Sequence, residues 1–229
     1  MKDSNNIEVY SKEWCPYCKK AKAFLKSKGL DYKEYNIDKQ DKMDEMVERT
    51  GNRSVPQIIM DGKSIGGYDD LIALEKSGEL NQMLDIKDDD YSQQKWELII
   101  IGSGPAALNA ALYGARKGID LLLVSRDMGG QVIDTNEIDN YLGKEDISGA
   151  KLMFDFWDHV HKYDISSVIG EEVKGIERDN QYHKIETDNG KEYKTQAVII
   201  ASGTQKRHLG MKQEYVLKGK GVHYCASCD

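Results

Sequence analysis

One segment limits the fold of this chain more than any other. Residues 97–124 read ELIIIGSGPAALNAALYGARKGIDLLLV. An apolar run is followed by glycines, by a stretch rich in Ala and Leu that ends at Gly118, and then by a second apolar run. Two such runs joined by a helical stretch are typical of parallel buried strands with a crossover helix. The segment therefore predicts a βαβ unit with its glycines at the turn from strand to helix.

The glycines at this turn have the spacing G-x-G-x-x-A, at Gly102, Gly104 and Ala107. The first glycine allows a tight turn, the second lets backbone approach a pyrophosphate, and the small third residue permits close packing of the helix on the strand. The phosphates of a dinucleotide would lie at the helix N-terminus. The acid that commonly binds the ribose after the second strand is replaced by Ser-Arg-Asp at 125–127. The spacing thus indicates a dinucleotide site, and Arg126 read alone would suit the 2′-phosphate of NADPH.

The four cysteines form two Cys-x-x-Cys pairs, Cys15 with Cys18 and Cys225 with Cys228. They could make one metal site, two structural disulfides or two redox couples. The sequence starts without a secretory leader, so a reducing cytosol is expected, where such pairs are more often catalytic or metal-binding than structural. Zinc ribbons place about 15 to 20 residues between their pairs, whereas residues 19–224 intervene here. We therefore expect no metal site.

The first pair has the features of a reactive thiol followed by a sheltered one. Pro16 suits the first position of a helix, where its missing N–H costs nothing. Cys15 is then expected at the helix N-terminus, where free N–H groups and the helix dipole favour a thiolate, and Lys12 and Lys19 add positive charge. Cys18 lies one turn along the same helix, so it can attack a mixed disulfide formed at Cys15.

Residues 7–84 alternate strand-like and helix-like patterns. The order strand, helix, strand, helix, hairpin, helix predicts a small α/β domain with its own core. The hairpin is expected in VPQIIMDGKSIGG, residues 55–67, with a turn at its Asp-Gly step. Asp69 is expected to cap the last helix.

This segment resembles a glutaredoxin in YSKEWCPYC at residues 10–18, SVPQI at 54–58 and GGYDD at 66–70. The resemblance implies a thioredoxin-like fold in which Cys15 attacks, Cys18 resolves and Pro56 follows a cis peptide bond. It also implies a glutathione groove lined by Lys12, Tyr17, Val55, Pro56, Gly67 and Asp69.

Residues 97–229 resemble the first portion of a low-molecular-weight thioredoxin reductase. The resemblance lies in GSGPAALNAALYGARKG, MGGQV, TNEIDNYLG, AVIIASGT and CASCD, in this order. It implies that the βαβ unit binds FAD, with Cys225 and Cys228 as the redox disulfide and Asp229 as the acid that manages the proton. The FAD contacts that it implies are Gly102, Ser103, Gly104, Pro105 and Ala106 at the pyrophosphate, and Gly130, Gln131 and Asn140 at the flavin portion.

The expected fold class is α/β, with a thioredoxin-like glutaredoxin domain followed by an incomplete Rossmann-like FAD/NAD(P)-binding domain. The glutaredoxin domain is expected at 1–84, an acidic linker at 85–95, the FAD-binding domain at 96–215 and the start of the NADPH and redox-disulfide domain at 216–229. No second glycine fingerprint occurs after Cys228, so the NADPH site is expected to lie outside this chain.

These features predict a thiol-disulfide oxidoreductase. Electrons would pass from NADPH through FAD and Cys225–Cys228 to Cys15–Cys18, and on to disulfide or glutathionylated protein substrates. The alternative is a glutaredoxin-only carrier, or a module that binds glutathione or an iron–sulfur cluster beside an inert flavin half. The net charge of −7 argues against a nucleic-acid partner, which needs a concentrated basic face. We expect a cytoplasmic protein without a membrane partner, and a homodimer if the reductase part is complete.

Overall fold

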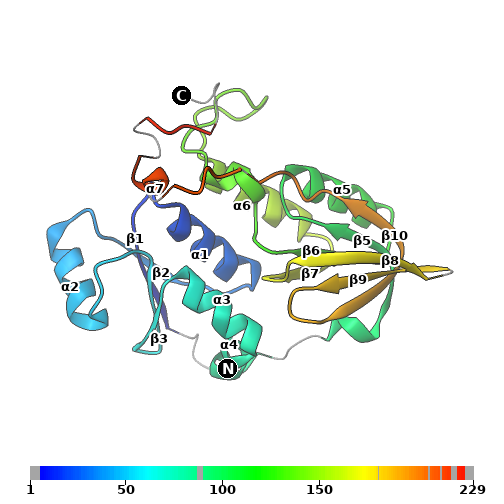
Figure 1. The fold of residues 1–229 in the computed structure, drawn as a ribbon, viewed down its shortest axis with the longest axis horizontal. Helices are drawn as coiled ribbons and strands as arrows, with labels where there is room; N and C mark the ends of the chain where they lie inside the picture. The colour runs from blue at the N-terminus through cyan, green and yellow to red at the C-terminus, as the bar shows by residue number, and fades with distance from the viewer. Residues whose placement is uncertain are drawn as a thin grey trace.

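The computed structural model describes residues 6–86, 90–179, 181–205, 207–211, 213–217 and 221–224. Two sheets, each covered by helices, form the two halves of the molecule (Figure 1). The first half spans the predicted glutaredoxin domain and the second spans the predicted FAD-binding domain. Both are α/β, as the sequence predicts.

The first half contains a four-stranded sheet of order β2-β1-β3-β4. Strand β1 pairs in parallel with β2 and antiparallel with β3, so the sheet is mixed. Its elements are β1 (Ile7–Ser11), α1 (Pro16–Ser27), β2 (Lys33–Asn36), α2 (Gln40–Thr50), β3 (Gln57–Met60), β4 (Lys63–Gly66), α3 (Tyr68–Ser77) and α4 (Glu79–Leu84).

Local turn chemistry explains how these elements are joined. The β3–β4 hairpin turns at Asp61 and Gly62, whose φ angles of 50° and 80° are the left-handed values that a tight hairpin needs. The prediction of one last helix is wrong in detail. Gly78, with a φ of 76°, ends α3 and separates it from the short helix α4.

The prediction that Asp69 caps α3 is also wrong. Helix α3 begins at Tyr68 with Gly67 as its N-cap. The carboxylate of Asp70 accepts the Gly67 N–H over 2.7 Å, whereas Asp69 lies in the first turn without that role. A side chain at the third helical position can reach back to the N-cap N–H, which the second position does not do in this arrangement.

The second half contains a six-stranded sheet of order β7-β6-β5-β10-β9-β8. Strands β7, β6, β5 and β10 run parallel, and β10, β9 and β8 form an antiparallel extension. The predicted βαβ unit is confirmed as β5, α5 and β6. The elements are η1 (Tyr91–Gln93), β5 (Lys95–Ile101), α5 (Pro105–Arg116), β6 (Leu121–Ser125), η2 (Gly130–Asp134), α6 (Gly149–Val160), β7 (Ser166–Ile169), β8 (Val173–Asp179), β9 (Tyr182–Thr187), β10 (Glu192–Ile200) and α7 (Glu214–Leu217).

Helix α1 joins the two halves. It packs on α3 within its own half and on α6 and η2 of the other half, and Figure 1 shows it between the first sheet and α6. One cluster of buried apolar side chains runs through this contact, from Ile7 and Phe24 to Leu98 and Trp157. Phe24 also approaches Gly170 closely, because a Cβ at Gly170 would lie 3.4 Å from its ring.

Within the described part of the chain, four lysines of the first half bind oxygen atoms of the second half. All the acceptors are Asp or Asn residues, so the contact is charge-complementary. The pairs are Lys19 Nζ with the Asp134 carbonyl oxygen (3.3 Å) and Asn136 Oδ1 (2.9 Å), Lys20 with Asp127 (3.5 Å), Lys26 with Asp158 (2.9 Å) and Lys76 with Asp188 (2.6 Å).

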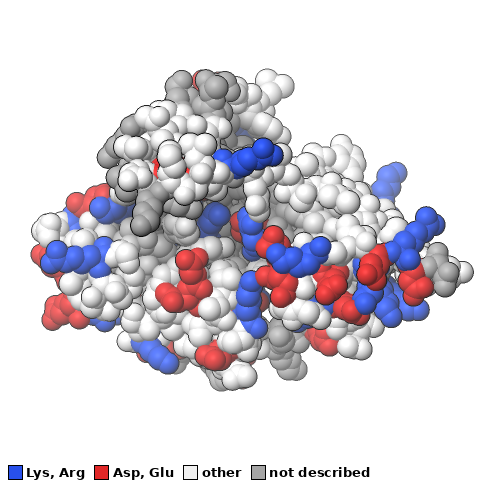
Figure 2. All heavy atoms as spheres, in the orientation of Figure 1, with Lys and Arg blue, Asp and Glu red and all other residues white. Residues whose placement is uncertain are grey.

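The surface in Figure 2 mixes charges of both signs, with Lys and Arg of the described residues lying beside Asp and Glu. Among the helices that the structure describes, none combines the length and apolar character needed to cross a bilayer.

Candidate functional site

The first cysteine pair occupies the start of α1, as predicted. Cys15 is the N-cap residue, with extended backbone at φ −78° and ψ 116°, and Pro16 follows as the first helical residue. The Cys18 N–H donates to Cys15 Sγ over 3.3 Å. Both cysteines are free thiols, and Cys15 is 5% exposed whereas Cys18 is 0% exposed. The nucleophile and the sheltered resolving thiol predicted from sequence are therefore one helical turn apart.

The two thiols have opposite acidities. The pKa of Cys15 is lowered to about 6 by a hydrogen bond from the Cys18 side chain, then by the backbone N–H groups of Cys18 and Tyr17 and by the charge of Lys22, while burial opposes this. The pKa of Cys18 is raised by the same bond to Cys15 and by burial. At neutral pH Cys15 is mainly thiolate and Cys18 stays protonated, which is the asymmetry that thiol-disulfide exchange requires.

The lysines around Cys15 differ in part from those expected. Lys22, two turns along α1, is the cation that lowers the Cys15 pKa most, and sequence reasoning missed it. Lys19 is attracted by the Cys15 charge, but its ammonium group donates to Asp134 and Asn136. Lys12 lies 4.0 Å from the Asp38 carboxylate. Residues seven positions apart lie on the same face of a helix, so the spacing of Cys15 and Lys22 could have identified Lys22 from the sequence.

Three of the residues predicted to bind glutathione, Val55, Pro56 and Gly67, lie on neighbouring segments beside Cys15. The Val55–Pro56 peptide bond is cis, as predicted, and the Val55 carbonyl oxygen lies 3.7 Å from Cys15 Sγ. A Cβ at Gly67 would lie 3.6 Å from the Pro56 carbonyl oxygen, so the start of α3 borders the same loop.

The remaining three predicted glutathione residues lie close to Cys15 in sequence or in the first turn of α3. The Lys12 carbonyl accepts the N–H of Cys15 over 3.2 Å. Tyr17 is 53% exposed, with its ring 6.3 Å from that of Tyr68, and Asp69 is exposed in the first turn of α3. Glutathione binding at these residues stays a prediction.

The turn between β5 and α5 requires its glycines. Gly102 has a φ of 113°, and a Cβ there would lie 2.3 Å from the Ala201 carbonyl oxygen. Gly104 is the N-cap of α5, so no side chain caps the first N–H groups of this helix. Pro105 follows as its first residue. A Cβ at Gly130 would lie 3.3 Å from the Gly104 Cα, so two backbone segments approach each other here. The N–H groups at the start of α5 are therefore available to bind a ligand of phosphate size.

This turn borders a cavity of about 470 Å³ at the carboxyl ends of the parallel strands, where dinucleotides bind in open α/β sheets. Seven of the eight predicted FAD residues line it, whereas Asn140 is exposed in the loop before α6 and lies outside the lining. The lining residues from the second half are Ile101–Ala106, Val124–Asp127, Gly130–Val132, Asp134, Glu172, Val173 and Ala201–Gln205.

Within this cavity Ser103 has a structural role. Its hydroxyl donates to the Asp127 carbonyl oxygen, lies 3.1 Å from Ser125 Oγ and accepts the Gly129 N–H over 3.1 Å. The Ser103 side chain therefore links the glycine turn to the segment that follows β6. The backbone of Ser103 is the part that can face a ligand. Gln131 Nε2 donates to Thr204 Oγ1 over 2.7 Å and joins two lining segments.

Among the described residues that line this cavity, one comes from the first half of the molecule. Lys20 of α1 reaches this cavity and lies 3.5 Å from the Asp127 carboxylate. Sequence reasoning did not find it, because Lys20 is one of several lysines on α1 and nothing in their spacing marks a long-range contact.

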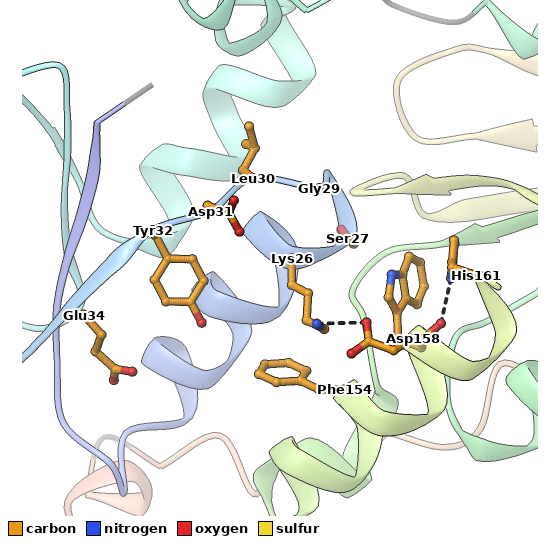
Figure 3. A pocket seen from close by; sticks show the side chains of 11 residues that line it. Lys26, Ser27, Gly29, Leu30, Asp31, Tyr32, Glu34, Phe154, Asp158 and His161 are labelled. Atoms are coloured by element: carbon orange, nitrogen blue, oxygen red, sulfur yellow. Dashed lines mark hydrogen bonds and ion pairs between the residues drawn. The ribbon is translucent and has the colours of Figure 1, made fainter. Parts of the chain in front are cut away.

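A second cavity, of about 680 Å³, lies between the C-terminal part of α1 and α6 (Figure 3). Lys26 crosses it to Asp158 over 2.9 Å, and the rings of Trp157 and His161 stack with centroids 4.0 Å apart. Burial lowers the pKa of His161 and raises that of Tyr32 to about 12, so both side chains are neutral near pH 7. Because α1 has Cys15 at its other end, this cavity is separate from the thiols.

Cys225, Cys228 and Asp229 lie outside the described residues, so the second redox pair stays a prediction. Among the described residues, no three His, Cys, Asp or Glu side chains come together as a potential metal site.

Comparisons with known proteins agree with this division of the chain. The Glutaredoxin family model matches residues 7–65, and the Pyridine nucleotide-disulphide oxidoreductase model matches residues 96–229. The crystal structure of Lactococcus lactis thioredoxin reductase in its FR conformation superposes with a TM-score of 0.50 at 38% identity, covering 58% of this chain and 44% of that one.

Two curated relatives extend the similarity across both halves. A Bacillus subtilis protein named NADH dehydrogenase is 31% identical over 188 residues, which cover 80% of this chain and 35% of that protein. An alkyl hydroperoxide reductase polypeptide of Staphylococcus aureus is 31% identical over 178 residues, which cover 77% of this chain and 34% of that protein. Since 80% of the chain exceeds residues 96–229 alone, the first of these alignments reaches the first half.

The chain spans about a third of the length of these two relatives. Both resemblances predicted from the sequence are confirmed by the family models. The chain belongs to the pyridine nucleotide-disulphide oxidoreductase family and carries a glutaredoxin domain ahead of that family's domain.

Proposed function

We propose that this chain is a thiol-disulfide oxidoreductase that passes electrons from NADPH, through FAD and the Cys225–Cys228 pair, to Cys15 and Cys18. The Cys15–Cys18 pair in turn reduces disulfide or glutathionylated substrates. The family of residues 96–229 supports the flavin part of this route, and the glutaredoxin match supports its last step. A reducing cytoplasm is the proposed location, because it keeps reactive thiol pairs in the dithiol form.

The observation that carries the proposal is the opposite acidity of the first two thiols. Cys15, with a pKa lowered to about 6, is the nucleophile at neutral pH. Cys18, with a raised pKa, remains a protonated thiol. The attacking species in disulfide exchange is the thiolate, so the attack begins at Cys15 and not at Cys18.

In the first step the Cys15 thiolate attacks one sulfur of the substrate disulfide. A bond forms between Cys15 Sγ and that sulfur while the substrate's own S–S bond breaks. The released substrate thiolate takes a proton from water. The cis Val55–Pro56 loop beside Cys15 and the exposed Tyr17 border the place where the substrate binds.

In the second step Cys18 resolves the mixed disulfide. Once Cys15 carries no charge, the hydrogen bond and the charge repulsion that raise the Cys18 pKa are gone. Cys18 then loses its proton and attacks Cys15 Sγ, and the second substrate thiol leaves. The dithiol has become a disulfide and has given two electrons to the substrate.

The cavity beside α5 fits the phosphates of FAD. Gly102, Gly104, Pro105 and Ala106 would hold the pyrophosphate at the open helix start, because a side chain at Gly102 would fill the turn. A bound FAD supplies two-electron transfer between a reduced nicotinamide and a disulfide.

A single-turnover experiment tests the thiol chemistry. The reduced full chain is mixed with a glutathionylated peptide, and the products are measured by mass spectrometry. The proposal expects free peptide and glutathione together with a Cys15–Cys18 disulfide, at a rate that Cys15→Ser abolishes. Peptide release that is unchanged in Cys15→Ser would contradict it. Titration with FAD, followed by the quenching of flavin fluorescence, tests the cofactor separately.

A further inference from the structure

We propose that Lys20 of the glutaredoxin domain is a dinucleotide-binding residue, so that the FAD site of the second half is completed by helix α1 of the first. This inference rests on the proposed function, because it assumes that the cavity beside α5 takes FAD. It assigns the positive charge of Lys20 to the adenosine diphosphate part of the ligand.

The geometry places Lys20 at one particular end of the cavity. Its ammonium group lies 3.5 Å from Asp127, just beyond the end of β6. In a dinucleotide-binding βαβ unit, the end of the second strand meets the adenosine ribose, and the pyrophosphate lies across the cavity at the helix N-terminus. Lys20 therefore faces the adenosine and phosphate part and not the flavin ring.

The charges at this end of the cavity depend on Lys20. Asp127 is held by Arg126 at 3.3 Å as well as by Lys20. Arg126 and Asp127 alone have no net charge, and Asp127 would repel a phosphate. With Lys20 these three side chains have a net charge of about +1. Asp134 and Glu172 also line the cavity, and Glu172 is paired with Lys174 at 3.0 Å, so Lys20 and Arg126 are the described lining cations that can attract the anionic pyrophosphate. The side chains of Lys20 and Asp127 are 27% and 17% exposed, so water weakens this attraction only in part.

The backbone that carries Lys20 is fixed against the second half. Lys19, the preceding residue, is only 5% exposed and donates to Asp134 and Asn136 just across the cavity rim. Tyr68 of α3 is half-buried near this contact, where burial and then the charge of Asp127 raise its pKa. Both α1 and α3 therefore lie near Asp127, and Lys20 is held at the cavity and not extended into solvent.

A linkage follows from this arrangement. If FAD gains affinity from Lys20, then FAD binding favours the position in which α1 contacts η2 by the same factor, because coupling between two binding events is reciprocal. The occupied flavin site would therefore help to hold the glutaredoxin domain in the position seen in Figure 1.

The test compares FAD and ADP binding by the full chain and by three variants. Lys20→Gln should weaken both ligands by roughly three- to tenfold at low salt, because it removes a charge that meets a phosphate. ADP lacks the flavin, so an equal loss for both ligands places the effect at the adenosine end. Lys20→Arg, which keeps the charge, should bind nearly as the unchanged chain does.

Lys26→Gln is the matched control. It removes another lysine–aspartate pair between the two halves, but Lys26 lines the other cavity. Its affinity for FAD should stay within about twofold of the unchanged chain, and all variants should keep the same melting temperature within about 4 °C. Equal FAD affinity in Lys20→Gln, or an equal loss in Lys26→Gln, overturns the inference and leaves the proposed function standing. If the unchanged chain binds neither FAD nor ADP, the flavin part of the proposed function fails as well.

Discussion

The backbone N–H of Cys18 lies 3.3 Å from the sulfur of Cys15 and points at it. The resolving residue therefore also stabilises the charge of the nucleophile. The Cys18 side chain contributes the largest share of the lowered Cys15 pKa. One residue thus has two successive roles, because it first supports the thiolate and then attacks the mixed disulfide that the thiolate forms.

The first prediction concerns the pH dependence of Cys15. With a pKa of about 6, Cys15 is thiolate above that pH, so its alkylation rate should rise to half its maximum near pH 6 and level off by about pH 8. Cys18→Ala removes the S–H donor and should move the inflection upward. Iodoacetamide labelling at a series of pH values, with Cys15 identified by peptide mass spectrometry, measures it. An inflection at or above about 8.5, the value of a free cysteine, would falsify the activated thiolate.

The second prediction separates the roles of the two thiols. Cys18→Ser should still release peptide from a glutathionylated peptide when free glutathione is supplied, because glutathione can resolve the mixed disulfide at Cys15. Cys15→Ser should lose this activity at least a hundredfold, since Cys18 is fully buried and protonated. Steady-state rates with glutathione and a coupled nicotinamide assay distinguish the variants, and equal losses would contradict the assigned order.

Much of the fold could be predicted because its signals are local. Pro16 after Cys15 fixes the start of α1, and Asp61 with Gly62 supplies the two left-handed residues of a hairpin. The alternation of apolar runs with the turn at Gly102 marks the βαβ unit. Each of these depends on residues within a few positions of one another, where backbone sterics and turn chemistry decide the outcome.

The features that sequence did not provide depend on contacts between distant segments. Lys20 and Asp127 meet only because α1 packs on η2, and no periodicity in either segment encodes that contact. The motif around Asn140 predicts a flavin contact, yet its loop leaves it outside the cavity lining. The sequence assigns the capping of α3 to Asp69, whereas the carboxylate that accepts the N–H of the N-cap Gly67 is that of Asp70, because the backbone at Gly67 decides which aspartate can reach its N–H.

The third prediction concerns the lysine that acts on Cys15. Lys22→Gln removes the positive charge that lowers the Cys15 pKa, so the alkylation rate at pH 6 should fall by roughly twofold. Lys12→Gln is the control, because Lys12 lies beside Asp38 and is not among the principal causes of that pKa shift. The rate at pH 9 should be the same in all three proteins, where Cys15 is fully ionised. A larger effect of Lys12→Gln would contradict the role of Lys22 as the cation that lowers the Cys15 pKa.

The last prediction tests the glycine turn, with two glycines that share left-handed backbone but differ in their surroundings. Gly102 has a φ of 113°, and a Cβ there would lie 2.3 Å from the Ala201 carbonyl oxygen and 2.8 Å from its carbon. Gly118 has a φ of 72°, and a Cβ there meets nothing within 4 Å. Gly118→Ala should therefore lower the free energy of unfolding by about 1 kcal/mol, from backbone strain alone.

Gly102→Ala should cost roughly 3 kcal/mol or more, because Ala201 directly follows β10 and its N–H donates to the Ile101 carbonyl oxygen over 2.8 Å, so its backbone cannot yield as a flexible side chain would. Urea denaturation followed by far-UV circular dichroism gives both values, and FAD titration of the folded variants gives the second readout. Gly118→Ala should bind FAD as the unchanged chain does, whereas Gly102→Ala should lose measurable binding, because the turn that approaches the pyrophosphate can no longer form. If both variants lose the same stability and retain FAD, the close approach of Gly102 to Ala201 does not shape the site.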